Sequence, residues 1–102
     1  MAETDLTIER HENASNGGES GEYLARIPGS DATGKLTWVK RGDARVAEHT
    51  LVPGALRGQG IAAELVKALV ADAREQGFRI VPACSYVAAK FDENPNWSDL
   101  RA

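Results

Sequence analysis

The chain has 102 residues, enough for one hydrophobic core but too few for a second domain. Its formal net charge of −3, without a Lys/Arg-rich stretch, argues against nucleic-acid binding. The single cysteine, Cys84, excludes an intramolecular disulfide, and no segment approaches the roughly 20 apolar residues of a membrane span. We therefore expect a single domain over residues 1–102, cytoplasmic and free of the membrane.

Short strands fill the first half of the chain. Alternating apolar and polar residues predict strands at Leu6–Arg10, Tyr23–Ile27, Lys35–Lys40 and Ala44–Val52. Asn13–Ser20 is rich in Asn, Gly and Ser and predicts a turn or hairpin loop. Brief connections between such strands favour an antiparallel four-strand meander.

The hydrophobic period then changes from that of a strand to that of a helix. Between Gly60 and Gln76 apolar residues recur every three and four positions, and Gly77 suits the C-terminal cap. A fifth strand is predicted at Phe78–Val81, parallel to the fourth through a right-handed crossover. A short helix at Ser85–Phe91 and a final helical piece within residues 94–100 complete a predicted α+β fold with a mixed sheet.

The turn before the long helix predicts an anion site. Arg57-Gly58-Gln59-Gly60 opens the helix, whose first N–H groups lack intrahelical partners and lie at the positive end of its dipole. The glycines allow the backbone to approach a phosphate closely. A Walker loop is excluded, because no Gly-Lys-Ser/Thr follows. Gly58-x-Gly60-x-x-Ala63 formally matches a dinucleotide fingerprint, but a Rossmann domain starts its sheet with that unit.

Three motifs in order resemble the GCN5-related N-acetyltransferases, and more closely their minimal single-domain YjdJ-type branch. The glycine turn of residues 57–62 reads Arg-Gly-Gln-Gly-Ile-Ala, and the family's leading Arg or Gln falls on Ala55 or Leu56. His-Thr-Leu-Val-Pro at residues 49–53 precedes it, and Pro-Ala-Cys-Ser-Tyr-Val at residues 82–87 follows. With the Asn94-Pro95-x-Trp97 tail, the resemblance extends from Leu6 to Leu100.

The resemblance implies acetyl-CoA in the wedge between the fourth and fifth strands. Its pantetheine amides would pair with the backbone of Thr50, Leu51 and Val52, as an added strand does. Its pyrophosphate would lie on the amides of Arg57, Gly58, Gln59, Gly60, Ile61 and Ala62. The family's usual helices between strands one and two do not fit in Asn13–Ser20. An acceptor site without those walls suits an exposed amine, on a small molecule or on a protein lysine or N-terminus.

Cys84 and His49 are the candidate catalytic residues. Cys84 follows strand five at the start of a helix, which lowers a thiol pKa and favours a nucleophile in ping-pong transfer. His49 has the unperturbed pKa of a base near neutral pH and could deprotonate the amine or activate Cys84. Strict alternation puts His49 on one face with Ala47 and Leu51, opposite Glu48, the alternative base. A buried structural cysteine and a packed histidine are the other interpretations, and no metal site is predicted.

Two functions from different classes follow. The first is an acetyl-CoA-dependent N-acetyltransferase. The alternative is a CoA-binding or protein-interaction module with little or no catalytic activity, because so small a domain can bind the cofactor without a defined acceptor pocket. A plain structural α+β domain would require the three ordered motifs to be a coincidence.

Overall fold

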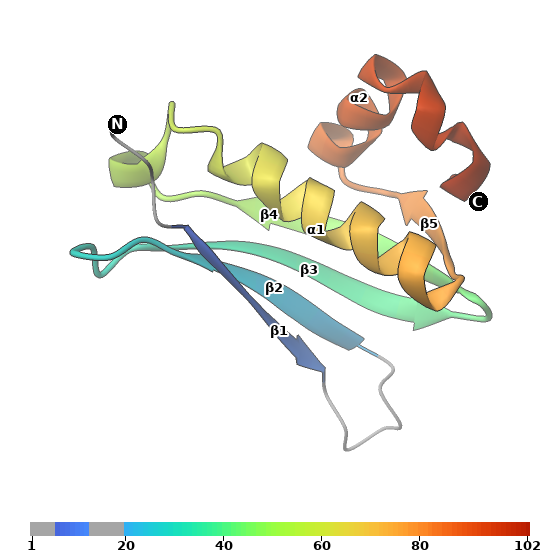
Figure 1. The fold of residues 1–102 in the computed structure, drawn as a ribbon, viewed down its shortest axis with the longest axis horizontal. Helices are drawn as coiled ribbons and strands as arrows, with labels where there is room; N and C mark the ends of the chain where they lie inside the picture. The colour runs from blue at the N-terminus through green and yellow to red at the C-terminus, as the bar shows by residue number, and fades with distance from the viewer. Residues whose placement is uncertain (1–5, 13–19) are drawn as a thin grey trace.

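The computed structural model describes residues 6–12 and 20–102. They form one sheet in the order β1-β2-β3-β4-β5 (Figure 1). The strands are β1 (Thr7–Glu12), β2 (Ser20–Arg26), β3 (Thr33–Arg41), β4 (Ala44–Leu51) and β5 (Arg79–Pro82). The first four pair antiparallel, and β4 pairs with β5 in parallel. The predicted mixed sheet is therefore confirmed. Of the predicted turn at Asn13–Ser20, residues 13–19 lie outside the described residues, and Ser20 begins β2.

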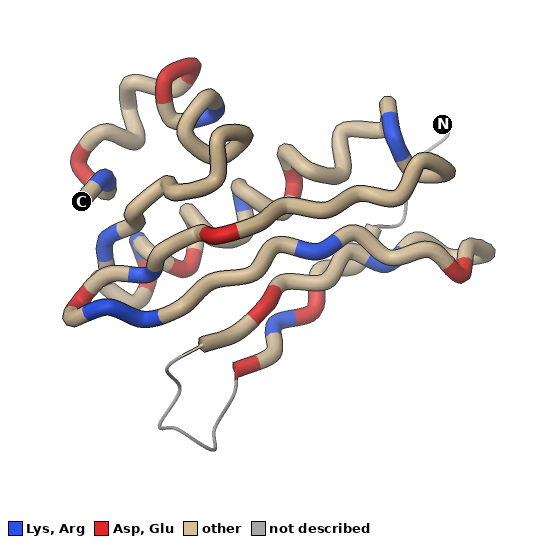
Figure 2. The backbone as a smooth tube through the Cα atoms, turned by 180° about the vertical axis from the view of Figure 1, so that it is seen from behind, with Lys and Arg blue, Asp and Glu red and all other residues tan. Residues whose placement is uncertain are grey.

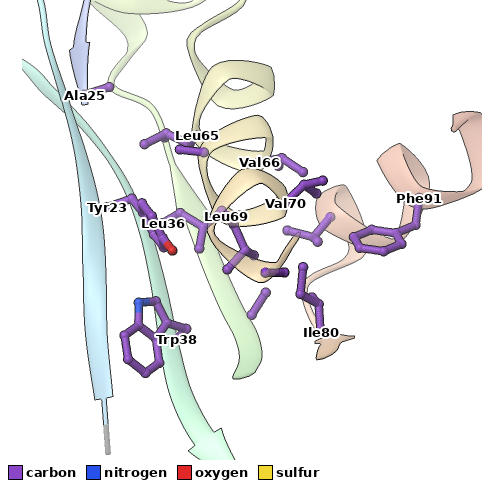
Figure 3. Packing of buried hydrophobic residues seen from close by; sticks show 14 of the residues in the cluster. Tyr23, Ala25, Leu36, Trp38, Leu65, Val66, Leu69, Val70, Ile80 and Phe91 are labelled. Carbon is purple, nitrogen blue, oxygen red and sulfur yellow. The ribbon is translucent and has the colours of Figure 1, made fainter. Parts of the chain in front are cut away.

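The crossover between β4 and β5 is the long helix α1 (Ile61–Gln76), which lies along one face of the sheet (Figures 1 and 3). Its apolar stripe meets the buried side chains of β2 and β3, among them Leu36 and Trp38. Leu65 and Leu69 are fully buried there, and burial of a leucine stabilises a fold by about 1.5–3 kcal/mol. The helix ends at Gly77, whose N–H donates to the carbonyl of Ala73.

The C-terminal segment packs beside α1 and β5. It consists of α2 (Ser85–Glu93) and the 3₁₀ helix η3 (Pro95–Leu100). Phe91 of α2 and Trp97 of η3 meet edge to face, with ring centroids 5.5 Å apart. Arg74 of α1 donates to Asp99 at 3.1 Å, which fixes η3 to the long helix. No helix of the described part of the chain is long and apolar enough to cross a membrane.

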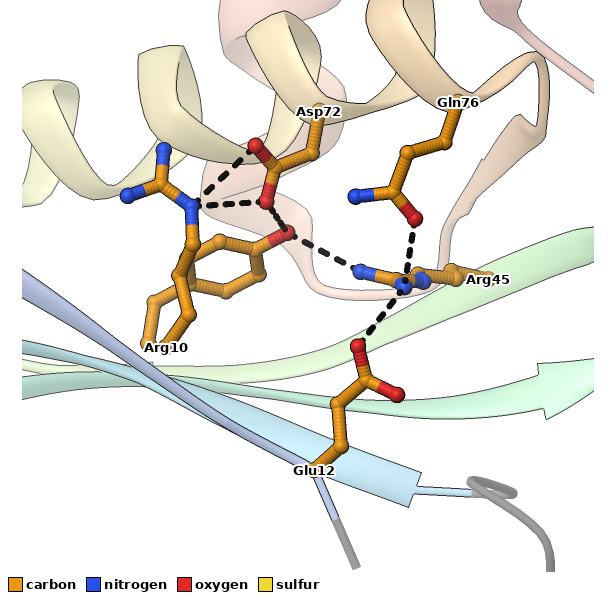
Figure 4. Close-up of polar contacts among 6 residues, drawn as sticks. Arg10, Glu12, Arg45, Asp72 and Gln76 are labelled. Carbon is orange, nitrogen blue, oxygen red and sulfur yellow. Dashed lines mark hydrogen bonds and ion pairs between the residues drawn. The ribbon is translucent and has the colours of Figure 1, made fainter.

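A buried carboxylate joins α1 to two strands directly and to a third through a tyrosine hydroxyl (Figure 4). Asp72, 6% exposed, accepts hydrogen bonds from Arg10 of β1 at 2.8 Å and from the Tyr23 hydroxyl of β2 at 2.8 Å. Arg45 of β4 donates to the same tyrosine oxygen at 3.1 Å, and its guanidinium lies 3.9 Å from the centre of the Trp38 ring. Each charged group thus has a partner, as burial of charge requires.

The other face of the sheet carries no helix among the described residues (Figure 2). Acidic and basic positions are interspersed along the strands in that view, with no long run of one sign. The side chain of Leu51 is 59% exposed, and His49 and Glu48 are exposed as well. Leu51 is the exposed large apolar side chain of this face among the described residues, and the partly buried Leu24 and Val39 face the same side.

Candidate functional site

Strands β4 and β5 separate before β4 ends. Their register runs from Ala44 opposite Arg79 to Ala47 opposite Pro82. The N–H of Cys84 donates to the carbonyl of Ala47 at 2.9 Å, and the chain then enters α2. Beyond Ala47, β4 continues to Leu51 with no counterpart in β5. This unpaired edge of β4, facing the start of α2, forms the wedge that the sequence predicted.

The glycine turn lies at the far end of that wedge. A 3₁₀ turn, η2 (Gly54–Leu56), leads into Gly58 with φ 81° and Gly60 with φ 74°. Both angles are in the left-handed region, where a side chain is strained. A Cβ at either glycine would meet no atom within 4 Å, so the turn is open on its outer side. The first helical hydrogen bond runs from the N–H of Glu64 to the carbonyl of Gly60, so the N–H groups of residues 61–63 have no partner within the helix.

A cavity of about 190 Å³ lies against this turn. Predicted cofactor-binding residues line it: Val52, Arg57, Gly58, Gly60, Ile61 and Ala62. Leu56 and Tyr86 of α2 complete the lining. Arg57 donates from Nε to the carbonyl of Val52 at 3.3 Å, which holds its guanidinium beside the cavity. The predicted residues Gln59, Thr50 and Leu51 do not line it, and the side chain of Leu51 points to the open face of the sheet.

The strict alternation predicted for β4 is interrupted by a bulge. Thr37 of β3 pairs with His49 and Trp38 with Ala47, so Glu48 is the extra residue on β4. Thr50 pairs with the buried Leu36 and therefore faces α1, whereas His49 faces the open side. The prediction that His49 shares a face with Ala47 is corrected accordingly. One inserted residue exchanges the two faces for all that follows it.

The bulge brings Thr50 to Cys84. The Cys84 thiol donates to Thr50 Oγ1 at 3.6 Å, and Cys84 is the N-cap residue of α2. Partial burial by itself raises the pKa of the thiol, but the N–H of Val87, the hydroxyl of Thr50 and the N–H of Tyr86 favour the thiolate and outweigh this effect. In the structure the Cys84 side chain makes no capping hydrogen bond to α2. The net effect is a Cys84 pKa below its ordinary value. A nucleophilic thiolate is chemically feasible at this position.

His49 and Cys84 are not brought together. Thr50, the neighbour of His49, occupies the place beside the sulfur, and the imidazole lies on the exposed face of β4. Glu48, the alternative base, is exposed at the bulge. The Thr50 side chain is the functional group that sequence reasoning missed, because a bulge leaves no mark in the alternation. Within residues 6–12 and 20–102 no three His, Cys, Asp or Glu side chains are grouped to hold a metal.

A larger cavity, about 340 Å³, lies at the opposite end of α1, around Gln76 and Phe78. Arg45 lines this cavity. The centre of its guanidinium lies 3.9 Å from the centre of the Trp38 ring and 4.1 Å from that of the Phe78 ring, and the guanidinium already donates to the Tyr23 hydroxyl. That cation serves the fold. The glycine turn and the wedge are therefore the better candidate for a ligand site, despite the smaller cavity.

This geometry agrees with the comparison of the sequence with protein families. A model described as GCN5-related N-acetyl-transferase matches residues 22–100, which is most of the chain. The chain belongs to the GCN5-related N-acetyltransferases. The narrower assignment to the YjdJ-type branch stays a prediction.

Solved structures with the same fold include IAA acetyltransferase from Bacillus cereus ATCC 14579. That structure is 17% identical in sequence and matches with a TM-score of 0.62. The match covers 87% of this chain and 75% of the Bacillus cereus chain. A structure from Agrobacterium tumefaciens, assigned to the acetyltransferases, is 20% identical with a TM-score of 0.40 and covers 89% of this chain and 60% of its own. The first of these likenesses supports the shared fold.

Proposed function

We propose that this chain, as a single domain over residues 1–102, is an acetyl-CoA-dependent N-acetyltransferase. The observation that carries the proposal is the order of three features along the wedge. The wedge leads from the open glycine turn at Gly58–Gly60, along the unpaired edge of β4, to the partly buried Cys84. Each part of a thioester cofactor would meet a suitable group there, in a chain that belongs to an acetyltransferase family.

The turn suits a pyrophosphate. Backbone N–H groups between Arg57 and Ala62 lie at the positive end of α1, and the guanidinium of Arg57 adds a charge-assisted contact. The backbone from Thr50 to Val52, which has no partner in β5, would bind the pantetheine amides in the manner of an added strand. This direction brings the thioester toward Cys84.

Cys84 is proposed as the nucleophile. The bound cofactor supplies an acetyl group activated as a thioester. The Cys84 thiolate forms a bond to the acetyl carbonyl carbon, and the bond to the CoA sulfur breaks as the thiolate of CoA leaves and takes a proton. A neutral amine then attacks the acetyl carbon on Cys84, and the cysteine thiolate departs. The products are one acetylated amine and one CoA thiol, and the proton lost by the amine balances the proton taken up by the CoA thiolate.

His49 is proposed as the base that removes the proton from the amine. It lies on the uncovered face of β4, so the acceptor would approach from that side while the cofactor occupies the side of α1. The uncovered face also favours the alternative, a CoA-binding or protein-interaction module with little catalysis, since no helix of the described residues walls the acceptor. The acceptor is an amine on a small molecule or on a protein.

Two measurements test the proposal. Acetyl-CoA should raise the melting temperature, by linkage of binding to folding. Intact-protein mass spectrometry after mixing should then show the mass of one acetyl group on the wild type and none on Cys84→Ala. A melting shift without any adduct, and without turnover on a panel of amines, would favour the binding module. No shift at millimolar acetyl-CoA would overturn both functions.

A further inference from the structure

Thr50 is placed beside Cys84 by the β4 bulge rather than by the strand period. With Glu48 as the extra residue, Thr50 lies on the α1 side of the sheet, opposite the buried Leu36. Its Oγ1 is 3.6 Å from Cys84 Sγ. Without the bulge, His49 would occupy that side. The fold thus selects a hydroxyl, and not an imidazole, as the side-chain partner of the only cysteine.

The groups that converge on the sulfur are donors without charge. They are the hydroxyl of Thr50, its backbone N–H, and the N–H groups of Tyr86 and Val87 in the first turn of α2. The two helix amides are those that an N-cap side chain normally accepts from, although the Cys84 side chain makes no capping hydrogen bond in the structure. Amides in rigid elements have fixed directions, whereas the threonine hydroxyl rotates. Only the hydroxyl can accept from the neutral thiol and donate to the thiolate.

Charged and titratable side chains lie on both flanking elements. On α2, Tyr86 follows Cys84 by two residues and has the amine of Lys90 5.5 Å from the centre of its ring. On β4, Glu48 and His49 precede Thr50 and are exposed. Thr50 and Cys84 are both half-buried, in contrast to these exposed β4 neighbours.

We propose that Thr50 is a positioning residue for Cys84, whose hydroxyl donates to the thiolate and keeps the sulfur directed into the wedge. This inference rests on the proposed function, in which Cys84 receives the acetyl group. The hydroxyl accepts from the thiol before deprotonation and reverses its hydrogen bond afterwards. It donates again to the sulfur when the acetyl group is passed to the amine and the thiolate reforms.

The competing explanation is that Thr50 only packs. Valine has nearly the same shape without the hydroxyl, and serine keeps the hydroxyl without the methyl group. Thr50→Val and Thr50→Ser therefore separate hydrogen bonding from packing. Because Cys84 is the only cysteine in the sequence, the rate of alkylation by iodoacetamide reports on that sulfur alone.

The experiment is the pH dependence of this alkylation in the full chain without acetyl-CoA. Loss of a hydrogen bond to a charged sulfur should move the midpoint of Thr50→Val upward by about one pH unit, and Thr50→Ser should retain the wild-type midpoint. Equal midpoints in all three proteins, or an upward shift in both variants, would overturn the proposal. Thr50→Ala, with the same expected upward shift, replaces Thr50→Val if the valine variant is unfolded by circular dichroism.

Failure of this inference is distinguishable from failure of the proposed function. Alkylation requires no cofactor, whereas the acetyl adduct on Cys84 does. In the acetyl assay, Thr50→Val should form the adduct about tenfold more slowly at neutral pH while acetyl-CoA still raises its melting temperature as in the wild type. An unchanged adduct rate in Thr50→Val would also overturn the positioning role.

Discussion

Cys84 Sγ lies 3.6 Å from Oγ1 of Thr50, although 34 positions separate the two residues in the chain. The contact joins the end of β4 to the start of α2 at the point where β4 and β5 separate. The cysteine thus lies at the inner end of a wedge whose outer end is the glycine turn. The proposed reactivity of Cys84 and the proposed binding of a thioester cofactor both depend on this one local arrangement.

Gly60→Glu should abolish stabilisation by acetyl-CoA. The substitution places a carboxylate where the pyrophosphate is expected, on a residue whose outer side is open. Gly42→Glu is the matched control, because Gly42 also has positive φ, 63°, with nothing within 4 Å of its Cβ position, in the turn between β3 and β4. Thermal melting with and without acetyl-CoA measures the effect. A full ligand-induced shift in Gly60→Glu would contradict the assignment of the turn.

His49→Gln should lower kcat for amine acetylation by about 10²-fold, the usual contribution of a positioned general base. Formation of the acetyl adduct on Cys84 should be unchanged, since His49 does not contact the sulfur. His11→Gln, on the same open face, is the control. A His49→Gln variant with the wild-type kcat would remove His49 from the mechanism.

Asp72→Ala should destabilise the fold by about 1–3 kcal/mol, because it leaves the buried Tyr23 hydroxyl without its acceptor, while Arg10, whose side chain is 48% exposed, can turn to solvent. Urea denaturation measures this loss. Glu75→Ala, at an exposed position of the same helix, should change the free energy of unfolding by less than about 0.5 kcal/mol. Equal stabilities for the two variants would show that the Asp72 network contributes little.

Tyr23→Phe removes the hydroxyl that donates to Asp72 and accepts from Arg45. Burial raises the pKa of Tyr23 far above its ordinary value, and the hydrogen bond to Asp72 is the second largest cause of this shift. The hydroxyl therefore stays protonated throughout the neutral range. The substitution should therefore cost about 1–3 kcal/mol of unfolding free energy, by the same amount at pH 6 and pH 9. Urea titrations at the two pH values measure it. A loss of unfolding free energy at only one of the two pH values would show that the Tyr23 hydroxyl does not stay protonated.

Much of the fold could be predicted from the sequence, because local patterns carry it. The alternation of the strands, the helical period between Gly60 and Gln76, and the glycines at both ends of that helix each reflect local backbone preferences. The turn was predictable for the same reason, since its two glycines precede a helix start. The predicted final helical piece within residues 94–100 is a 3₁₀ helix over Pro95–Leu100, and its Trp97 packs on Phe91 of α2.

The sequence by itself determined the order of the elements, the glycine turn and the presence of a single cysteine after strand five. The tertiary structure alone decided which β4 side chain meets that cysteine. The bulge forms because the partners of Thr37 and Trp38 on β4 are two residues apart, which leaves one extra residue on β4. Such a shift depends on how the two strands pair. The same holds for Asp72, whose partners come from β1 and β2. Contacts between distant segments follow from the packing of helix on sheet, which no local pattern records.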